Sequence, residues 1–323
     1  MTSSAGSHRH SKPSNKVPFE GMQRREFLKV LMAAGIAPAQ IGFAFDQASG
    51  LLTRAIPATG ELIPAVGLGT SDEFDSIPQE GLNDLRTVLR QFVDLGGKVV
   101  DTAPNYGESE RILGELFTEL DIADDLFIAS KVSASGRESG IRQMEQSERL
   151  LGKRPLDLLQ SHSLRDLDTQ LANLKDRRAE GAVRYIGVTH RRARAFEQLE
   201  SLIRREPLDF VQFNYSVSTP DAEDRLLPAA ADLGVAVIIN RPFENGRLFR
   251  RTRGIELPDW AQDFDCESWA QFSLKYILSH PAVTCVIPAT SDPAHAVDNL
   301  RAGLGRLPDE ALRRRMRYYM AEL

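Results

Sequence analysis

The chain has 323 residues, of which 42% are hydrophobic and 7% aromatic, and its formal net charge is -5 at pH 7. This length and apolar content are enough for a substantial core, as one large α/β domain or two smaller ones. The slightly acidic balance argues against a general nucleic-acid binder. The two cysteines, Cys266 and Cys285, indicate neither a disulfide framework nor a CxxC metal site, so no metal centre is expected.

The amino-terminal segment differs in kind from the rest of the chain. Residues 1–20 are rich in Ser, His, Lys and Pro and have no apolar period, which is typical of disorder. Gln23–Lys29 then carries paired arginines before Phe and Leu, and a moderately apolar run extends from Val30 to about Ala44. This pattern resembles a bacterial twin-arginine signal, with cleavage either at 37–39 or near Ala44. The alternative is an ordinary amphipathic helix.

The signal-like segment predicts where the protein is found. The resemblance implies export by the twin-arginine machinery to the periplasm, with the cytoplasm as the alternative location. The apolar run is short and only weakly apolar, so stable membrane insertion is not expected. We therefore divide the chain into a leader, residues 1–44, and a single domain, residues 45–323.

The body of the chain alternates short β-branched runs with longer segments of helical period, which favours a parallel sheet with helices outside it. The expected strands are Ala65–Gly69, Lys98–Asp101, Leu126–Lys131, Leu156–His162, Arg184–Thr189, Phe210–Asn214, Val235–Asn240 and Val283–Pro288. Eight βα units in about 250 residues favour an α/β fold of the (β/α)8 TIM-barrel class. No strand precedes a GxGxxG fingerprint, which disfavours an open dinucleotide-binding sheet.

Three segments interrupt the alternation. Residues 56–63 read as a small hairpin that is expected to plug the barrel floor. The connection between Asn240 and Ser268 is expected to be irregular, either a functional lid or disordered. Residues 307–323 predict a basic amphipathic helix at the carboxyl terminus.

Polar side chains collect where the strands end. Asp101 ends the second strand, with Tyr106 in the following turn, Lys131 ends the third and His162 the fourth. The carboxyl ends of barrel strands form one rim, where catalytic groups are usually found. Each residue alone has a structural explanation, such as a helix cap, a surface charge or a core imidazole. The coincidence of the four favours a site.

Several short motifs resemble the aldo-keto reductase family and occur in family order. They are Gly67–Thr70, Asp101–Ala103 with Tyr106–Gly107, Ser130–Lys131, Leu158–His162, Ile186–Thr189, Val211–Tyr215 and Ile287–Thr290. The resemblance implies a catalytic tetrad of Asp101, Tyr106, Lys131 and His162, with NADP or NAD extended across the barrel mouth.

The chemistry of carbonyl reduction needs these residue types. Hydride transfer to a carbonyl leaves an alkoxide that a general acid must protonate. A free phenol, with a pKa of about 10, is a poor acid near neutrality. An ammonium beside Tyr106 would stabilise its phenolate, and Asp101 would keep Lys131 charged and in place. His162 would donate to the carbonyl oxygen and polarise it.

The resemblance also implies cofactor contacts from three groups of residues. Those near the nicotinamide are Thr70, Asp101, Thr189, His190 and Gln212. Those along the pyrophosphate are Asn240, Arg241, Pro242, Phe243, Gly246 and Leu248. Those at the adenosine end are Thr290, Ser291, Asp292, His295, Asp298 and Asn299. Some have structural alternatives, since Ser291 or Asp292 could cap the following helix.

The chain departs from the family pattern at both ends of the cofactor. His190 stands where the family often has Asn, and Asn240 stands where an aromatic commonly stacks on the nicotinamide. Stacking then falls to Phe243 or to the guanidinium of Arg241.

At the adenosine end, Ala289 and His295 replace the Lys and Arg with which NADP-preferring members hold the 2′-phosphate, and Asp292 lies nearby. An acid there would repel a phosphate and could accept hydrogen bonds from a free 2′-hydroxyl. The sequence therefore predicts that NADH competes well with NADPH.

The leading interpretation is an NAD(P)H-dependent aldo-keto reductase that reduces a small aldehyde or ketone. The alternatives are a non-catalytic nucleotide-binding protein of the same fold, acting as sensor or subunit, and a phosphate-binding barrel lyase or isomerase. The substrate site is expected to be shallow, with a rim that includes Phe74, Tyr106, Leu164 and Phe243.

Overall fold

The computed structural model describes residues 44–45, 50–75 and 81–323 together with Met1. The twin-arginine-like segment up to residue 43 lies outside the described residues. Among those that are described, no helix is both long and apolar enough to cross a membrane.

The apolar β-branched runs form an eight-stranded parallel sheet, as expected. Its strands are β4 (Leu68–Gly69), β5 (Val99–Asp101), β6 (Phe127–Val132), β7 (Leu156–His162), β8 (Val183–His190), β9 (Phe210–Asn214), β10 (Ala236–Asn240) and β11 (Cys285–Val286). Parallel bridges from Val66 to Val286 and from Gly69 to Ala289 join the first strand to the last. The sheet therefore closes into the predicted (β/α)8 barrel.

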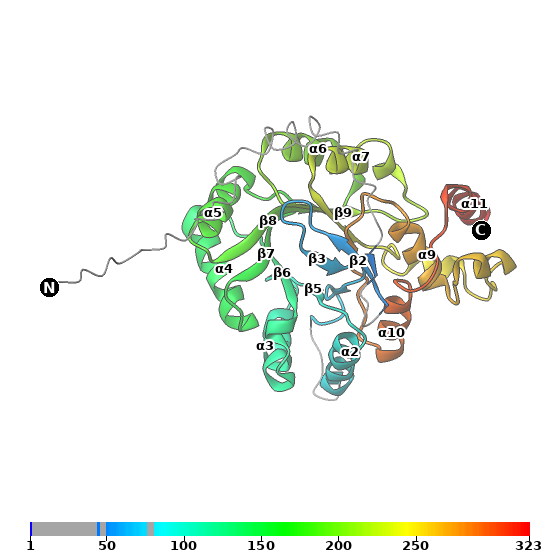
Figure 1. Ribbon diagram of the computed structural model, residues 1–323, viewed down its shortest axis with the longest axis horizontal. Coiled ribbons are helices and arrows are strands. Elements are labelled where there is room, and N and C mark those ends of the chain that lie inside the picture. The colour runs from blue at the N-terminus through cyan, green and yellow to red at the C-terminus, as the bar shows by residue number, and fades with distance from the viewer. Residues whose placement is uncertain (2–43, 46–49, 76–80) are drawn as a thin grey trace. The chain divides into compact units, whose positions relative to one another are not determined.

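Helices surround the sheet because each buries one apolar stripe against it (Figure 1). They are α2 (Leu82–Asp94), α3 (Ser109–Leu120), α4 (Arg137–Leu151), α5 (Leu167–Ala179), α6 (Phe196–Arg205), α7 (Leu226–Leu233), α9 (Trp269–Leu278) and α10 (Pro293–Arg301). Period-two alternation divides the core into two layers. Val99, Ala129 and Leu158 face the barrel interior, whereas their neighbours Val100 and Ile128 pack against the helices.

A hairpin covers the amino-terminal end of the barrel. Strands β2 (Leu52–Ala55) and β3 (Leu62–Pro64) are antiparallel, and β1 (Ala44–Phe45) pairs with β2. Ile56 and Ile63 pack among the inward-facing barrel residues. The Thr59 hydroxyl lies 2.8 Å from the hydroxyl of Tyr185, near the start of β8. The hairpin is at the barrel floor as expected, but its strands lie at 52–55 and 62–64, so most of the predicted segment 56–63 is the connection between them. Figure 1 shows the hairpin over the middle of the ring.

The connection between Asn240 and Ser268 is more regular than expected. It holds the short helix α8 (Arg247–Arg251) and a 3-10 turn, η5 (Asp259–Phe264). Leu248, Ala261 and Phe264 are buried in the outer core. Burial of these apolar residues outweighs the helix-breaking Pro and Gly residues on which the expectation depended.

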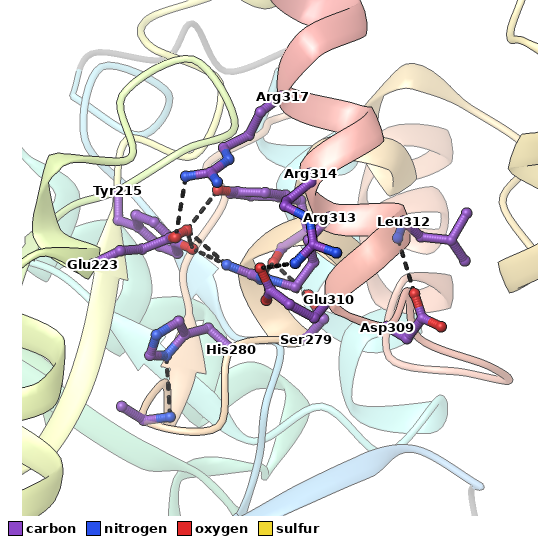
Figure 2. Close-up of polar contacts among 12 residues, drawn as sticks. Tyr215, Glu223, Ser279, His280, Asp309, Glu310, Leu312, Arg313, Arg314 and Arg317 are labelled. Carbon is purple, nitrogen blue, oxygen red and sulfur yellow. Dashed lines mark hydrogen bonds and ion pairs between the residues drawn. The ribbon is translucent and has the colours of Figure 1, made fainter.

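The carboxyl-terminal helix α11 (Glu310–Glu322) is anchored by Arg313 (Figure 2). One guanidinium nitrogen donates to Glu223 at 2.6 Å and to the Tyr215 hydroxyl at 2.9 Å, and the other donates to the Tyr276 carbonyl at 2.6 Å. Burial opposes the charge of Glu223, but hydroxyl donors and Arg313 outweigh it, so the pKa of Glu223 is lowered. This buried network ties α11 to the elements that follow β9 and to α9.

Candidate active site

The carboxyl ends of β5 and β6 bring Asp101 and Lys131 into direct contact. Lys131 Nζ lies 2.5 Å from Asp101 Oδ1 and also donates to the Thr102 carbonyl at 2.8 Å. The side chains of Lys131 and Asp101 are only 1% and 4% exposed. Burial alone would lower the pKa of Lys131, but the charge of Asp101 and the nearby Tyr106 outweigh it and raise this pKa. The amine is therefore a fixed positive charge near neutrality.

Tyr106 and His162 stand at the open side of this ion pair. Their rings meet edge to face with centroids 5.9 Å apart, and Lys131 Nζ lies 4.9 Å from the centroid of the Tyr106 ring. Burial first, and then the charge of Lys131, lowers the pKa of His162 to about 3. His162 is thus a neutral imidazole at pH 7 and can donate a hydrogen bond without releasing a proton. The structure brings all four predicted tetrad residues together at one rim.

Two amides hold the second oxygen of Asp101. Gln212 Nε2 donates to Asp101 Oδ2 at 2.9 Å, and Gln160 Nε2 lies 3.5 Å from the same atom. The Thr189 hydroxyl donates to Gln212 Oε1 at 2.8 Å. Gln160 is not among the site residues predicted from the sequence, although its place two residues before His162 puts both side chains on the inward face of β7.

Three buried amide oxygens near this rim lack hydrogen-bond donors within the described part of the chain. They are Gln160 Oε1, Asn214 Oδ1 and Asn240 Oδ1. Asn214 and Asn240 end the neighbouring strands β9 and β10. An unpaired buried acceptor is unfavourable, so these atoms suit a ligand that offers donors. The carboxamide and ribose hydroxyls of a nicotinamide nucleotide are such donors, and the residues fit that group.

The predicted nicotinamide residues differ in what they can still bind. Thr70 is fully buried, and its hydroxyl donates to the Asp101 carbonyl at 3.1 Å, so it helps to hold the strand end. His190 is only partly buried, and its Nδ1 accepts from the backbone N–H of Arg192 at 3.1 Å. This contact leaves Nε2 as the ring atom that can meet a ligand. The contacts of Thr70, Thr189, His190 and Gln212 with a cofactor stay predictions.

The predicted pyrophosphate residues divide between core and surface. Leu248 is 4% exposed and packs in the outer core, Pro242 is also buried, and Gly246 precedes α8. Phe243 is partly exposed and packs against Phe249, with ring centroids 5.0 Å apart. A polar cavity of about 210 Å³ opens beside this segment. It is lined by Asn214, Thr219, Arg241, Glu244 and Arg247.

At the adenosine end, Asp292 caps α10 by accepting from the N–H of Ala294 at 2.7 Å and of His295 at 3.3 Å. A second acid, not predicted from the sequence, contacts the residue before Asp292, because Ser291 donates to Glu73 Oε2 at 2.8 Å. Glu73 belongs to the loop after β4, so no local signal links it to Ser291.

Other predicted residues of this end serve the packing of α10. Asp298 accepts from Ser268 at 2.6 Å and from Gln271 at 2.7 Å, which directs its carboxylate to the start of α9. Thr290 and Asn299 are buried. The prediction that Phe74 lies at the rim is wrong. Its side chain is 0% exposed because it packs into the outer core below the rim.

The structure is a closed (β/α)8 barrel with a buried acid–amine pair, a phenol and an imidazole at its carboxyl rim. Residues 65–316 match the model of the Aldo/keto reductase family. The chain belongs to this family.

Individual relatives agree with this assignment. An aldo-keto reductase of Gibberella moniliformis is 30% identical over 202 residues, which are 58% of this chain and 61% of that relative. The chain therefore spans only part of the curated relative that it matches. The solved structure of the thermostable aldo-keto reductase Tm1743, in complex with the inhibitor epalrestat, has a TM-score of 0.70 at 26% identity and covers 83% of this chain and 99% of its own.

A Klebsiella pneumoniae aldo-keto reductase solved with NADPH shares the fold, with a TM-score of 0.68 at 24% identity over 80% of this chain and 92% of its own.

Proposed function

We propose that this protein is an NAD(P)H-dependent oxidoreductase that reduces an aldehyde or ketone to an alcohol, with Tyr106 as the general acid. The observation that carries the proposal is the buried Asp101–Lys131 ion pair, whose ammonium lies 4.9 Å from the centroid of the Tyr106 ring. Family membership and the NADPH bound to the Klebsiella pneumoniae structure support a nicotinamide cofactor.

Each tetrad residue then has a definite task. A bound nicotinamide supplies the hydride. Tyr106 transfers its hydroxyl proton to the carbonyl oxygen, and the ammonium of Lys131 stabilises the phenolate that remains. Asp101 keeps Lys131 charged, while the neutral His162 donates to the carbonyl oxygen and orients it. Burial of the ion pair strengthens these electrostatic effects because little water screens them.

The test removes a single oxygen. Tyr106→Phe is expected to lower carbonyl-dependent oxidation of NAD(P)H by about 10²–10⁴-fold while cofactor binding, measured by fluorescence, is retained. Tyr318→Phe is the matched control, because Tyr318 is 73% exposed and belongs to no part of the site. Undiminished turnover in Tyr106→Phe would contradict the proposal. If the wild type binds the cofactor but turns over no aldehyde or ketone, a non-catalytic nucleotide-binding protein is favoured. If it binds no cofactor at all, a lyase or isomerase is favoured.

NADH competes well with NADPH in this proposal. Glu73 and Asp292 put two carboxylates near the ribose end, and His295 is partly engaged there, since its Nδ1 lies 3.9 Å from Asp292 Oδ2. The 2′-phosphate of NADPH would meet these charges, whereas a 2′-hydroxyl could donate to one of them. The dissociation constants of the two cofactors are expected to be similar or to favour NADH. A strong preference for NADPH would refute this part of the proposal.

The protein reaches the periplasm by the twin-arginine route in this proposal, since Arg24 and Arg25 precede a moderately apolar run. Fractionation of cells that express the full chain should find it in the periplasm, and the double substitution Arg24→Lys with Arg25→Lys should retain it in the cytoplasm. The same distribution for both chains would contradict export.

A further inference from the structure

Three loops of the barrel mouth near His162 each carry an arginine. Two of these side chains have side-chain partners, because Arg165 Nε donates to Ser135 Oγ at 3.1 Å and Arg241 Nε donates to Asn245 Oδ1 at 2.9 Å. Arg165 follows β7, and its backbone N–H donates to the His162 carbonyl at 3.2 Å. Arg191 follows β8, two residues beyond Thr189, which pairs with His162 across the two strands. Arg241 follows β10, and its guanidinium lies 3.4 Å from the Arg191 carbonyl oxygen. The three loops therefore adjoin at one side of the tetrad.

The nearby carboxylates are already engaged. Glu244 Oε2 accepts from Arg247 Nε at 2.5 Å, and its other oxygen accepts from Ser216 at 2.6 Å. Asp166 accepts from the backbone N–H of Gly136 at 2.7 Å. Among the described residues, Arg191 forms no ion pair with any carboxylate. Within the part of the chain that the structure describes, the charge of Arg191 near His162 is therefore not neutralised by a carboxylate.

The positive charge of Arg191 acts on His162. After burial and Lys131, the charge of Arg191 is the next cause that lowers the pKa of His162. After burial, Arg191 is also the first cause that lowers the pKa of Arg241. Two arginine charges that repel one another are stabilised when an anion binds between them.

A cofactor accounts for only part of this charge. Arg241 and Arg247 line the polar cavity at the ends of β9 and β10, beside the segment expected to hold the pyrophosphate. Arg191 instead follows β8, which pairs with the strand that ends in His162. The carbonyl group of a substrate would lie beside His162. We propose that Arg191 binds an anionic group, a carboxylate or a phosphate, of the carbonyl substrate. This inference rests on the proposed reductase function and narrows its substrate class.

The test uses two aldehydes that differ in charge. The full chain is assayed with 4-carboxybenzaldehyde and with its neutral methyl ester, methyl 4-formylbenzoate. The wild type is expected to have the higher kcat/KM for the acid. Arg191→Ala should raise KM for the acid about tenfold more than KM for the ester, as loss of a charge-assisted hydrogen bond predicts. Arg191→Lys should recover part of the difference because it keeps the charge.

Arg149→Ala is the matched control. It removes one positive charge from the exposed last turn of α4, at the opposite end of the barrel, and should leave the ratio of the two KM values unchanged. The inference is overturned if Arg191→Ala affects both aldehydes equally. It is also overturned if that variant raises the cofactor dissociation constant by the same factor as KM for the acid, since Arg191 would then serve the pyrophosphate. Reduction of neither aldehyde by the wild type would instead count against the reductase function itself.

Discussion

Removal of the buried ion pair at the barrel rim should separate stability from catalysis. At the 2.5 Å separation of Lys131 and Asp101, an effective dielectric of about 20 gives an attraction of roughly 7 kcal/mol. Most of it offsets the cost of burying the two charges. In Lys131→Met, Asp101 keeps only the amide donors of Gln212 and Gln160. We expect this variant to lose about 3–5 kcal/mol of unfolding free energy.

The double variant Asp101→Asn with Lys131→Met is the informative comparison. It leaves no buried charge unpaired, so most of the lost stability should return, whereas carbonyl reduction should stay at least about 10²-fold below wild type because no ammonium faces Tyr106. Urea unfolding gives the free energies, and carbonyl-dependent NAD(P)H oxidation gives the activities. A double variant as unstable as the single one would refute the electrostatic reasoning, and a double variant with wild-type activity would refute the role of Lys131.

Three further predictions concern stability. Arg313→Met should lower the unfolding free energy by about 3 kcal/mol, since it removes the anchor of α11 seen in Figure 2, while Arg314→Met, at a side chain 54% exposed, should change it little. Burial, followed by Arg313, lowers the pKa of His280 from 6.5 to about 4. As pH falls from 6.5 toward 4, the unfolded chain therefore binds a proton that the folded one does not, and up to about 3 kcal/mol of unfolding free energy is lost. His280→Gln should lessen this loss, as measured by urea titrations at several pH values. Gly114→Ala should cost about 3 kcal/mol, because a Cβ would overlap the Leu150 carbonyl oxygen, and an unchanged denaturation midpoint would contradict that close approach of α3 and α4.

Much of the fold was readable because local pattern and tertiary structure agree. The expected strands Leu156–His162 and Phe210–Asn214 match β7 and β9 residue for residue. Their apolar alternation reflects the two faces of a barrel strand, so the same rule placed Lys131 and His162 toward the interior. The irregular connection after Asn240 was misjudged because buried Leu248 and Phe264 override Pro and Gly in that segment.

The site was only partly accessible from the sequence. Asp101, Tyr106, Lys131 and His162 each end a strand or follow one, so the barrel rule was enough to group them. Glu73 beside Ser291 and Gln160 beside Asp101 were missed, since each contact joins loops or strands that are far apart in the chain. Phe74 was placed at the rim because its position in a loop does not reveal that the side chain turns into the core.

The sequence by itself therefore determined the order of strands and helices, the class of barrel and the identity of the four rim residues, because these follow from local periodicity and strand ends. Only the tertiary structure decided that Lys131 is fully buried against Asp101, that the pKa of His162 is lowered, and that Glu73 accepts from Ser291, next to Asp292 in the chain. Burial and electrostatic coupling depend on distances between segments that are remote in the chain, and no local pattern encodes those distances.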